Sequence, residues 1–147
     1  MGKQPKTKEQ KDRETDLRLQ RTYGVGLDWY NEQFARQRGG CKICGDAPKT
    51  RRLHVDHDHT YRYVKINCSK GSDGVWMAFT IYWGLEYAEY GATKKEALSK
   101  VRQRIKVASV RALLCHRCNR AMILYRDKPE VLRKAADYLD DFQKGEK

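Results

Sequence analysis

The chain has 147 residues, 39% of them hydrophobic, which suits one ordinary domain and leaves little apolar material for a large core. Its formal charge of +12 favours a polyanionic partner such as nucleic acid, because clustered Lys and Arg displace counterions from a phosphate backbone. No run approaches the roughly 18 apolar residues of a membrane span, and no signal-peptide core opens the chain, so we expect a cytoplasmic protein without a membrane partner.

The first part of the chain changes character near residue 22. Residues 1–22 mix basic and acidic side chains with few apolar ones, which predicts a charged, flexible arm. Apolar side chains then recur at helical spacing: Trp29, Tyr30, Phe34 and Ala35. We therefore expect a short helix over 27–38, capped by Asp28 and ended by Gly39-Gly40.

Four of the five cysteines form two Cys-x-x-Cys pairs, Cys41 with Cys44 and Cys115 with Cys118. Four thiolates are the ligand set of a closed tetrahedral zinc site, which leaves no position for substrate. Such a structural Zn²⁺ would add binding energy of order 10 kcal/mol to a small core. The alternative is four buried or redox-active cysteines. Cys68 has no matching partner and is interpreted as a plain strand or loop residue.

Residues 52–59 begin as an alternating strand and become the run His54-Val55-Asp56-His57-Asp58-His59. Hydrolysis of a phosphodiester needs a base, a cation and stabilisation of the leaving oxygen. A carboxylate such as Asp56 and an amide oxygen such as that of Asn119 suit Mg²⁺, whereas a neutral histidine suits the base. Strict alternation would point Asp56 and His57 to opposite faces, so we expect a distortion or an edge position. A structural His/Asp network or a second zinc site is the alternative interpretation.

Residues 60–109 form a separate section. Aromatic and β-branched residues predict strands over 61–66 and 75–83 and a third, short strand over 86–90. Thr93 and Glu96 form a capping box ahead of a helix. The helix has an apolar face and a basic remainder, made of Ala97, Val101, Ile105 and Ala108, and of Lys94, Lys95, Lys100, Arg102, Arg104 and Lys106.

The aromatic side chains of residues 60–109 can be interpreted in two ways. The strands and basic helix are broadly similar to small sheet-plus-helix DNA-binding modules, with four aromatic side chains available for packing or for DNA: Trp76, Phe79, Tyr82 and Trp83. In the alternative, these aromatics form a small core of their own while the cations solvate the helix.

In the C-terminal section the apolar stretch 110–114 precedes the second cysteine pair, and after that pair we expect a helix through Leu124 and then a last helix. Asp127 can cap the last helix, Pro129 suits its first turn, and Glu130 completes a box. Its predicted buried stripe is Val131, Leu132, Ala135, Tyr138 and Leu139.

Three motifs occur in a specific order: Cys-x-x-Cys-Gly at 41–45, Leu-His-Val-Asp-His-Asp-His at 53–59, and Val-Arg-Ala-Leu-Leu-Cys-His-Arg-Cys-Asn at 110–119. With the helix before Cys41 and the ending Asp-Lys-Pro-Glu-Val-Leu-Arg-Lys-Ala-Ala-Asp-Tyr-Leu, they resemble the phage recombination endonuclease VII family of His-Me finger (HNH-like) nucleases. The resemblance covers roughly residues 23–59 and 110–142.

This resemblance implies an α+β fold, in which residues 23–59 and 110–147 form a zinc-stapled ββα-metal core and residues 60–109 are inserted as a strand-plus-helix module. By motif position, Asp56 and Asn119 would bind a catalytic Mg²⁺ or Mn²⁺, His57 would be the general base, and His59 would assist at the phosphate. The implied activity is hydrolysis of branched or mismatched DNA with 5′-phosphate products.

Two departures limit the transfer. About 50 residues separate the Asp-His strand from the second cysteine pair, where the family has a short hairpin. No carboxylate follows Asn119 closely, since Arg120, Ala121 and Met122 come next. We do not expect a long C-terminal extension of the kind that could intertwine subunits, so the question of a homodimer stays open.

Three readings of function and partner follow. Besides a DNA endonuclease, the sequence is compatible with a non-catalytic zinc-containing DNA-binding or packaging accessory protein and with a ribonuclease using the same metal site. DNA is the expected partner, followed by phage packaging or replication proteins in the host cytoplasm. The candidate DNA-binding cations are the six of the inserted helix (Lys94, Lys95, Lys100, Arg102, Arg104, Lys106) together with Arg111, Arg117 and Arg120.

Overall fold

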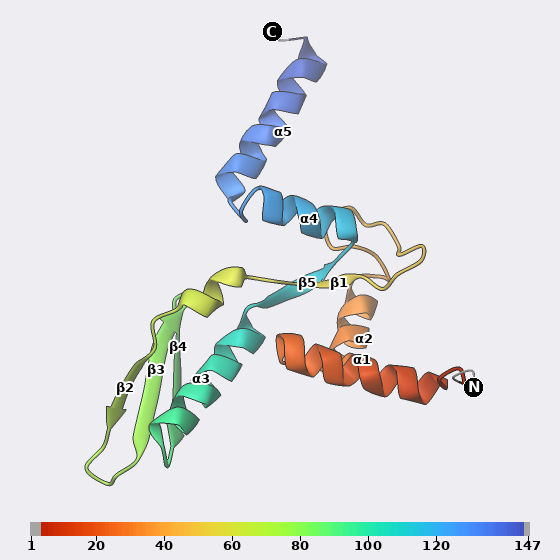
Figure 1. Ribbon diagram of the computed structural model, residues 1–147. Coiled ribbons are helices and arrows are strands. Elements are labelled where there is room, and N and C mark those ends of the chain that lie inside the picture. Colours follow the sequence, from red (N-terminus) through yellow and green to blue (C-terminus); the bar gives the residue numbers. More distant parts are fainter. Residues whose placement is uncertain (1–3, 146–147) are drawn as a thin grey trace.

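The computed structural model describes residues 4–145. Helices and strands follow one another as α1 (Lys8–Tyr23), α2 (Leu27–Arg36), β1 (His54–His57), the 3₁₀ helix η1 (His59–Tyr63), β2 (Asn67–Lys70), β3 (Trp76–Tyr82), β4 (Leu85–Gly91), α3 (Lys94–Ala108), β5 (Val110–Leu114), α4 (His116–Leu124) and α5 (Pro129–Lys144). The fold is therefore a mixed α+β one with two small sheets (Figure 1). No described helix is long and apolar enough to cross a membrane.

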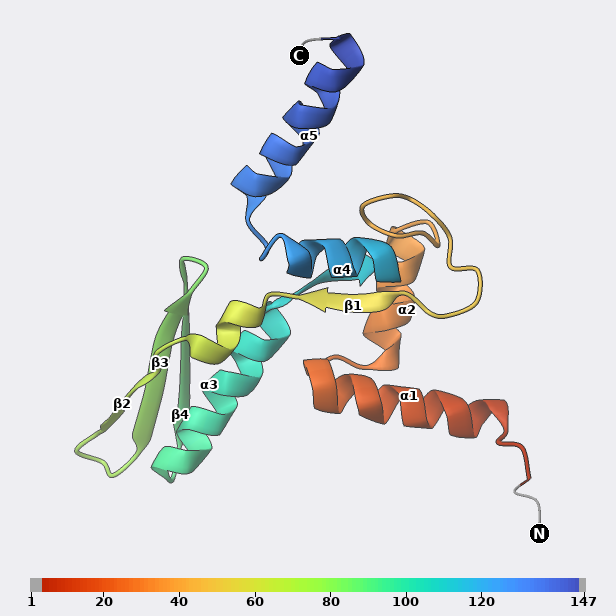
Figure 2. The same cartoon turned by 45° about the horizontal axis from the view of Figure 1, so that its top comes forward.

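Two separate hydrophobic cores organise the chain. The first lies among α1, α2, β1, β5 and α4, which we call the split core because the chain leaves it after β1 and returns at β5. Its buried residues include Leu19, Tyr30, Val55 and Leu113. The second core belongs to η1, β2, β3, β4 and α3, which we call the inserted module. Figure 2 shows the inserted module to the left of the split core, with β1 beside α4 and α2.

The N-terminal section corrects the prediction of a flexible arm. Residues 8–23 form α1, whose Leu19 is buried in the split core. Thr7 and Gln10 form a capping box at its start, which satisfies two backbone donors that the polar sequence would otherwise leave to water. Asp16 accepts from the Leu27 backbone N–H at 2.7 Å, so it, and not Asp28, supplies a carboxylate to the start of α2.

The two strands of the split core pair irregularly at the Asp-His run. β1 pairs with β5 in antiparallel register, Asp56 opposite Ala112 and His57 opposite Val110. The register therefore skips Arg111, which is a β-bulge between Asp56 and His57. The extra residue lies on β5, so the bulge interrupts the side-chain alternation of β5 at Arg111, and not that of β1 at Asp56 and His57.

The inserted module is a three-stranded antiparallel sheet, β2-β3-β4, with α3 on one face. Ala78 and Tyr82 of β3 point to α3 and are buried with Ala97, Val101 and Ile105, as the helical pattern predicted. The predicted strand over 61–66 is wrong. Residues 59–63 instead form η1, because the Asp58 carboxylate accepts the Thr60 backbone N–H at 2.9 Å and caps a turn.

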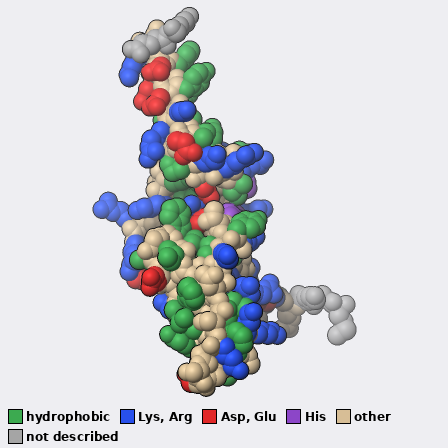
Figure 3. All heavy atoms as spheres, turned by 90° about the vertical axis from the view of Figure 1, so that its left-hand side faces the viewer, with side chains coloured by type: hydrophobic (Ala, Val, Ile, Leu, Met, Phe, Trp, Pro, Cys, Tyr) green, Lys and Arg blue, Asp and Glu red, His purple; other side chains and the backbone are tan. Residues whose placement is uncertain are grey.

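The last helix has the predicted position but not the predicted burial. α5 begins at Pro129 after Lys128, and no side chain caps it, since Asp127 is engaged by Arg111. Its apolar stripe is open to solvent, with Tyr138 71% and Phe142 72% exposed. Figure 3 shows hydrophobic side chains along one side of this helix and charged ones along the other.

Candidate metal centre and active site

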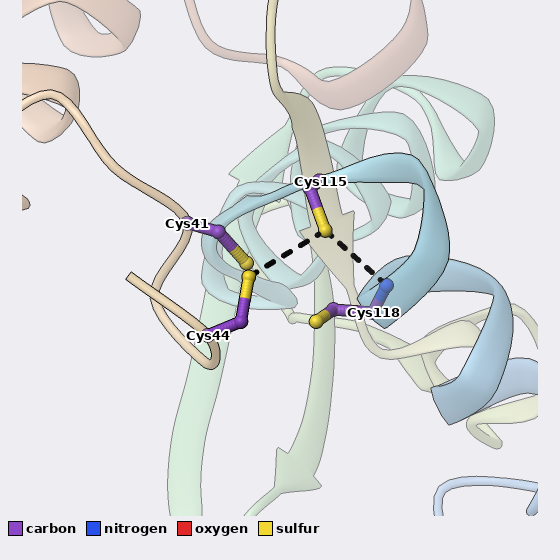
Figure 4. Close-up of side chains that lie close together, drawn as sticks. All are labelled: Cys41, Cys44, Cys115 and Cys118. Atoms are coloured by element: carbon purple, nitrogen blue, oxygen red, sulfur yellow. Dashed lines mark hydrogen bonds between the residues drawn. The ribbon is translucent and has the colours of Figure 1, made fainter. Parts of the chain in front are cut away.

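The four paired cysteines converge on one point. Cys41 and Cys44 come from the loop after α2, and Cys115 and Cys118 come from the start of α4 (Figure 4). All four sulfur atoms lie within 4.8 Å of one another, and the Cys44 and Cys115 sulfurs are 3.8 Å apart. A tetrahedron with Zn–S bonds of about 2.3 Å has edges of about 3.8 Å. The four side chains therefore fit a structural zinc ion.

The backbone around the first cysteine pair is fixed against β5. The Lys42 N–H donates to the Leu113 carbonyl at 3.0 Å, and the Gln37 side-chain amide exchanges hydrogen bonds with the same residue at 2.8 and 2.9 Å. A Cβ atom on Gly40 would lie 2.2 Å from the Gly45 carbonyl oxygen. Residue 40 must therefore be glycine for the turn around Cys41 to close.

The thiols carry opposed pKa shifts. Burial opposes ionisation of Cys41, yet backbone N–H groups at Cys115, Cys44 and Ile43 prevail and lower its pKa to about 7. Burial, followed by hydrogen bonding to the neighbouring cysteines, raises the pKa of Cys118. Four thiolates this close would repel one another, so a divalent cation is needed for all four to ionise together.

Asp56 lies almost wholly inside the protein, where its carboxylate forms a two-pronged ion pair with Arg111. The guanidinium donates to both carboxylate oxygens, at 2.7 and 3.0 Å, and also to Asp127 at 3.2 Å. Burial opposes the charge of Arg111, but the hydrogen bond and the charge of Asp56 raise the pKa of the guanidinium. The bulged residue Arg111 thus neutralises the charge of the Asp56 carboxylate, which the sequence analysis assigns to a metal.

His57 stands in a cage of rings at the bulge. Its ring centroid lies 4.4 Å from that of His59, 5.2 Å from Tyr23 and 6.1 Å from Tyr61. Burial lowers the pKa of His57, and the nearby charges of His59 and Arg62 act in the same direction, whereas Asp56 opposes them. At neutral pH this environment favours the neutral imidazole, which can accept a proton.

Asp58 has a structural place inside the same motif. It is 4% exposed and accepts hydrogen bonds from the Thr60 backbone at 2.9 Å, from the Tyr82 hydroxyl at 2.7 Å and from the Trp83 indole at 3.0 Å. Burial opposes its ionisation, but hydrogen bonds led by those from Thr60 lower its pKa to about 2. Asp58 therefore docks the inserted module onto β1, a role for Tyr82 and Trp83 that the sequence pattern did not indicate.

The remaining motif residues lie on either side of β1. His54 faces His116 at the zinc end of the strand, with ring centroids 5.6 Å apart. Asn119 is half-buried in the first turn of α4, where its backbone N–H donates to the Cys115 carbonyl at 3.0 Å. Since α4 packs against both β1 and β5, the second cysteine pair fixes where Asn119 stands relative to Asp56.

The candidate DNA-binding cations do not form one surface. Lys100 and Arg104 are paired with Glu96 and Glu89, and the Lys94 amine lies 5.8 Å from the centre of the Trp76 ring. Lys95, Arg102 and Lys106 line a groove on another side of α3. Arg117 and Arg120 are exposed on α4, whereas Arg111 is held by Asp56.

One comparison with known proteins identifies the family of the chain. The family model described as recombination endonuclease VII matches residues 16–141, nearly the whole chain and including the inserted module. No curated protein and no solved structure matches the chain. The family comprises nucleases, that is hydrolases, that act on branched DNA. The chain therefore belongs to the recombination endonuclease VII family of nucleases.

Proposed function

We propose that the chain is a metal-dependent endonuclease that cleaves structured DNA at the bulge between Asp56 and His57. In this proposal His57 is the general base that takes a proton from the attacking water, and His59 contacts the phosphate. The observation that carries it is the pairing of the two imidazoles, 4.4 Å apart, beside the buried carboxylate of Asp56.

Asp56 and Asn119 would hold the catalytic cation. Carboxylate and amide oxygens are the hard ligands that Mg²⁺ and Mn²⁺ prefer. Arg111 donates to both carboxylate oxygens of Asp56, so a divalent ion at this carboxylate would replace the guanidinium as the compensating charge. When bound, such an ion neutralises charge on the phosphate and the leaving oxygen. The antiparallel pair β1–β5 followed by α4 is the order of elements expected for a ββα-metal core.

The zinc cluster would contribute to cleavage by positioning Asn119. Asn119 directly follows Cys118, and α4 starts at the cluster, so the structural zinc would fix the amide relative to β1. As the resemblance implies, we expect water to attack phosphorus and the P–O3′ bond to break, with the 3′ oxygen as the leaving group, which leaves 3′-hydroxyl and 5′-phosphate ends. A homodimer and phage protein partners are expected only from the family resemblance.

The test compares two histidines of one strand. His57→Ala should reduce Mg²⁺-dependent cleavage of a four-way junction by about 10²–10⁴-fold, the usual contribution of a positioned base. Zinc content and DNA binding should stay close to those of the parent protein. His54→Ala is the matched control, since His54 lies at the other end of β1 beside His116, and it should cleave within a few-fold of the parent.

The proposal is wrong if His57→Ala cleaves undiminished, or if both variants lose activity equally. Analysis of end-labelled products identifies the chemical groups at the cut ends. Cleavage rates on a panel of junctions, nicked duplexes and linear duplexes identify the preferred DNA structure. Equal rates on every substrate would exclude a preference for branched DNA.

A further inference from the structure

A basic groove runs along the inserted module from the candidate active site. It has a volume of about 560 Å³ and lies between η1 and α3. Its apolar lining includes Val64, Ile66 and Ile105. Its cations are Arg62, Lys95, Arg102 and Lys106, and no carboxylate lines it within residues 4–145. A strip of this composition attracts a polyanion that also has apolar parts.

Two of the groove's cations are free to bind. None of the four cations forms an ion pair in the described part of the chain, but Arg62 donates to the Tyr61 hydroxyl and Lys106 to the Arg21 carbonyl. Within residues 4–145, the side chains of Lys95 and Arg102 form neither an ion pair nor a hydrogen bond. The opposite flank of the same helix differs, because Lys100 pairs with Glu96 at 2.7 Å and Arg104 pairs with Glu89 at 2.9 Å. Three of the α3 cations without an ion pair, Lys95, Arg102 and Lys106, therefore line the groove, whereas Lys94 lies over the Trp76 ring.

The groove is joined to the active site by Tyr61. The ring of Tyr61 lines the groove, and its centroid lies 6.1 Å from that of His57. From Lys95 to Lys106 the helix rises roughly 16 Å, the length of about five base pairs of duplex DNA. A DNA strand with a phosphate at His57 could therefore continue into the groove.

We infer that this groove binds the sugar–phosphate backbone of the DNA on one side of the scissile phosphate. Lys95, Arg102 and Arg62 contact phosphates, while the apolar lining packs against deoxyribose. This assignment rests on the proposed nuclease function for the position of the substrate. In this assignment the inserted module binds DNA without contacting bases. Contacts to the DNA backbone contribute affinity and fix the position of the protein on the DNA, but they do not distinguish sequences.

The experiment measures binding separately from cleavage. In the His57→Ala background, the affinity for a fluorescent four-way junction is measured by anisotropy over a series of salt concentrations. Lys95→Ala/Arg102→Ala removes the two free groove cations. Lys100→Ala/Arg104→Ala is the matched control, because it removes the same charge from the same helix on the flank that faces Glu96 and Glu89.

The groove variant should bind several-fold more weakly, and the slope of log affinity against log salt should fall in magnitude by about two, near 0.9 for each lost phosphate contact. The control should change affinity by less than about twofold. In the active background, the groove variant should raise KM and leave kcat at saturating DNA unchanged. Zinc content and circular dichroism verify that each variant is folded.

Two results overturn the inference: unchanged binding by the groove variant, or equal losses in the two double variants. Either result leaves the proposed nuclease standing if the parent protein cleaves DNA in the same buffer. Conversely, a selective loss of binding in the groove variant, with no cleavage by the parent protein, supports the groove and rejects the proposed chemistry.

Discussion

The split core and the inserted module are stabilised by different means. The inserted module closes a conventional hydrophobic core, in which Ala78, Ala97 and Val101 are fully buried. The split core has a hydrophobic cluster of its own, which includes Leu19, Val55 and Leu113, and it also brings together four cysteines and the Asp56–Arg111 ion pair. The comparison indicates that apolar contacts alone close the inserted module, whereas in the split core they act together with side chains that suit a cation.

The largest expected effect follows from removing zinc. Cys115→Ser should lose the ion and, with it, binding energy of order 10 kcal/mol, so the split core should unfold. Hydrogen exchange would then show lost protection at Leu113 of β5 and retained protection along α3. The control is Cys68→Ser, which lies outside the cluster and should leave zinc content unchanged. Lost protection in both units would mean that they do not fold independently.

A second change tests the module alone. Ile105→Ala removes a side chain that is 1% exposed and should cost about 2–5 kcal/mol of the module's free energy of unfolding. Zinc binding should persist. Ile81→Ala deletes the same atoms from the exposed face of β3 and should cost less than about 1 kcal/mol. Urea unfolding with zinc content measured in parallel gives both values, and equal costs would contradict the assigned core.

The contact between the two units gives the third effect. Tyr82→Phe removes a hydrogen bond to the charged Asp58 and should cost about 1.5–3 kcal/mol at pH 7. Because the pKa of Asp58 falls from 3.8 to about 2 on folding, this carboxylate stabilises the protein above about pH 4. The stabilisation is lost as the pH falls through 2.

Urea unfolding of Tyr82→Phe should therefore approach that of the parent protein between pH 4 and pH 2. Tyr87→Phe is the control, since the Tyr87 hydroxyl forms no hydrogen bond within residues 4–145. A destabilisation of Tyr82→Phe that is independent of pH would show that lost packing, and not the charge of Asp58, causes it.

The smallest effect concerns the ion pair between the half-exposed Arg111 and the buried Asp56 in the split core. Arg111→Ala should lower stability by about 1–3 kcal/mol in a buffer without added Mg²⁺, because it leaves the Asp56 carboxylate uncompensated. Added Mg²⁺ should recover part of this loss by binding the carboxylate. Thermal unfolding with and without Mg²⁺, without a chelator that would strip zinc, measures both. An equal Mg²⁺ effect on Arg117→Ala and Arg111→Ala would place the cation elsewhere.

Features set by short sequence distances were predictable. The two Cys-x-x-Cys pairs predict one four-cysteine cluster because their spacing alone lets both sulfurs reach an ion, and the structure confirms the cluster. The Thr93 capping box and the stripe of Ala97, Val101 and Ile105 likewise predicted α3 and its buried face. The order of the motifs predicted the family, which the match over residues 16–141 confirms.

Features set by distant partners were not predictable. An amphipathic pattern fixes the apolar side of α5 but not whether anything covers it, and the described residues leave it exposed. The charged sequence of α1 hid a helix whose packing depends mainly on Leu19. The Asp56–Arg111 pair and the hydrogen bond from Tyr82 to Asp58 join residues that lie 55 and 24 positions apart, so no local pattern indicates them.

The backbone where the inserted module begins and ends has an architectural consequence. The Asp58 N–H donates to the Ser109 carbonyl at 2.9 Å, so the chain enters and leaves the module at adjacent points. The module is therefore joined to the split core by two adjacent chain segments. A tight turn could connect β1 and β5 at the same place. Evolution or protein engineering can replace the inserted module with a shorter or different segment, provided that Asp58 receives new hydrogen-bond donors.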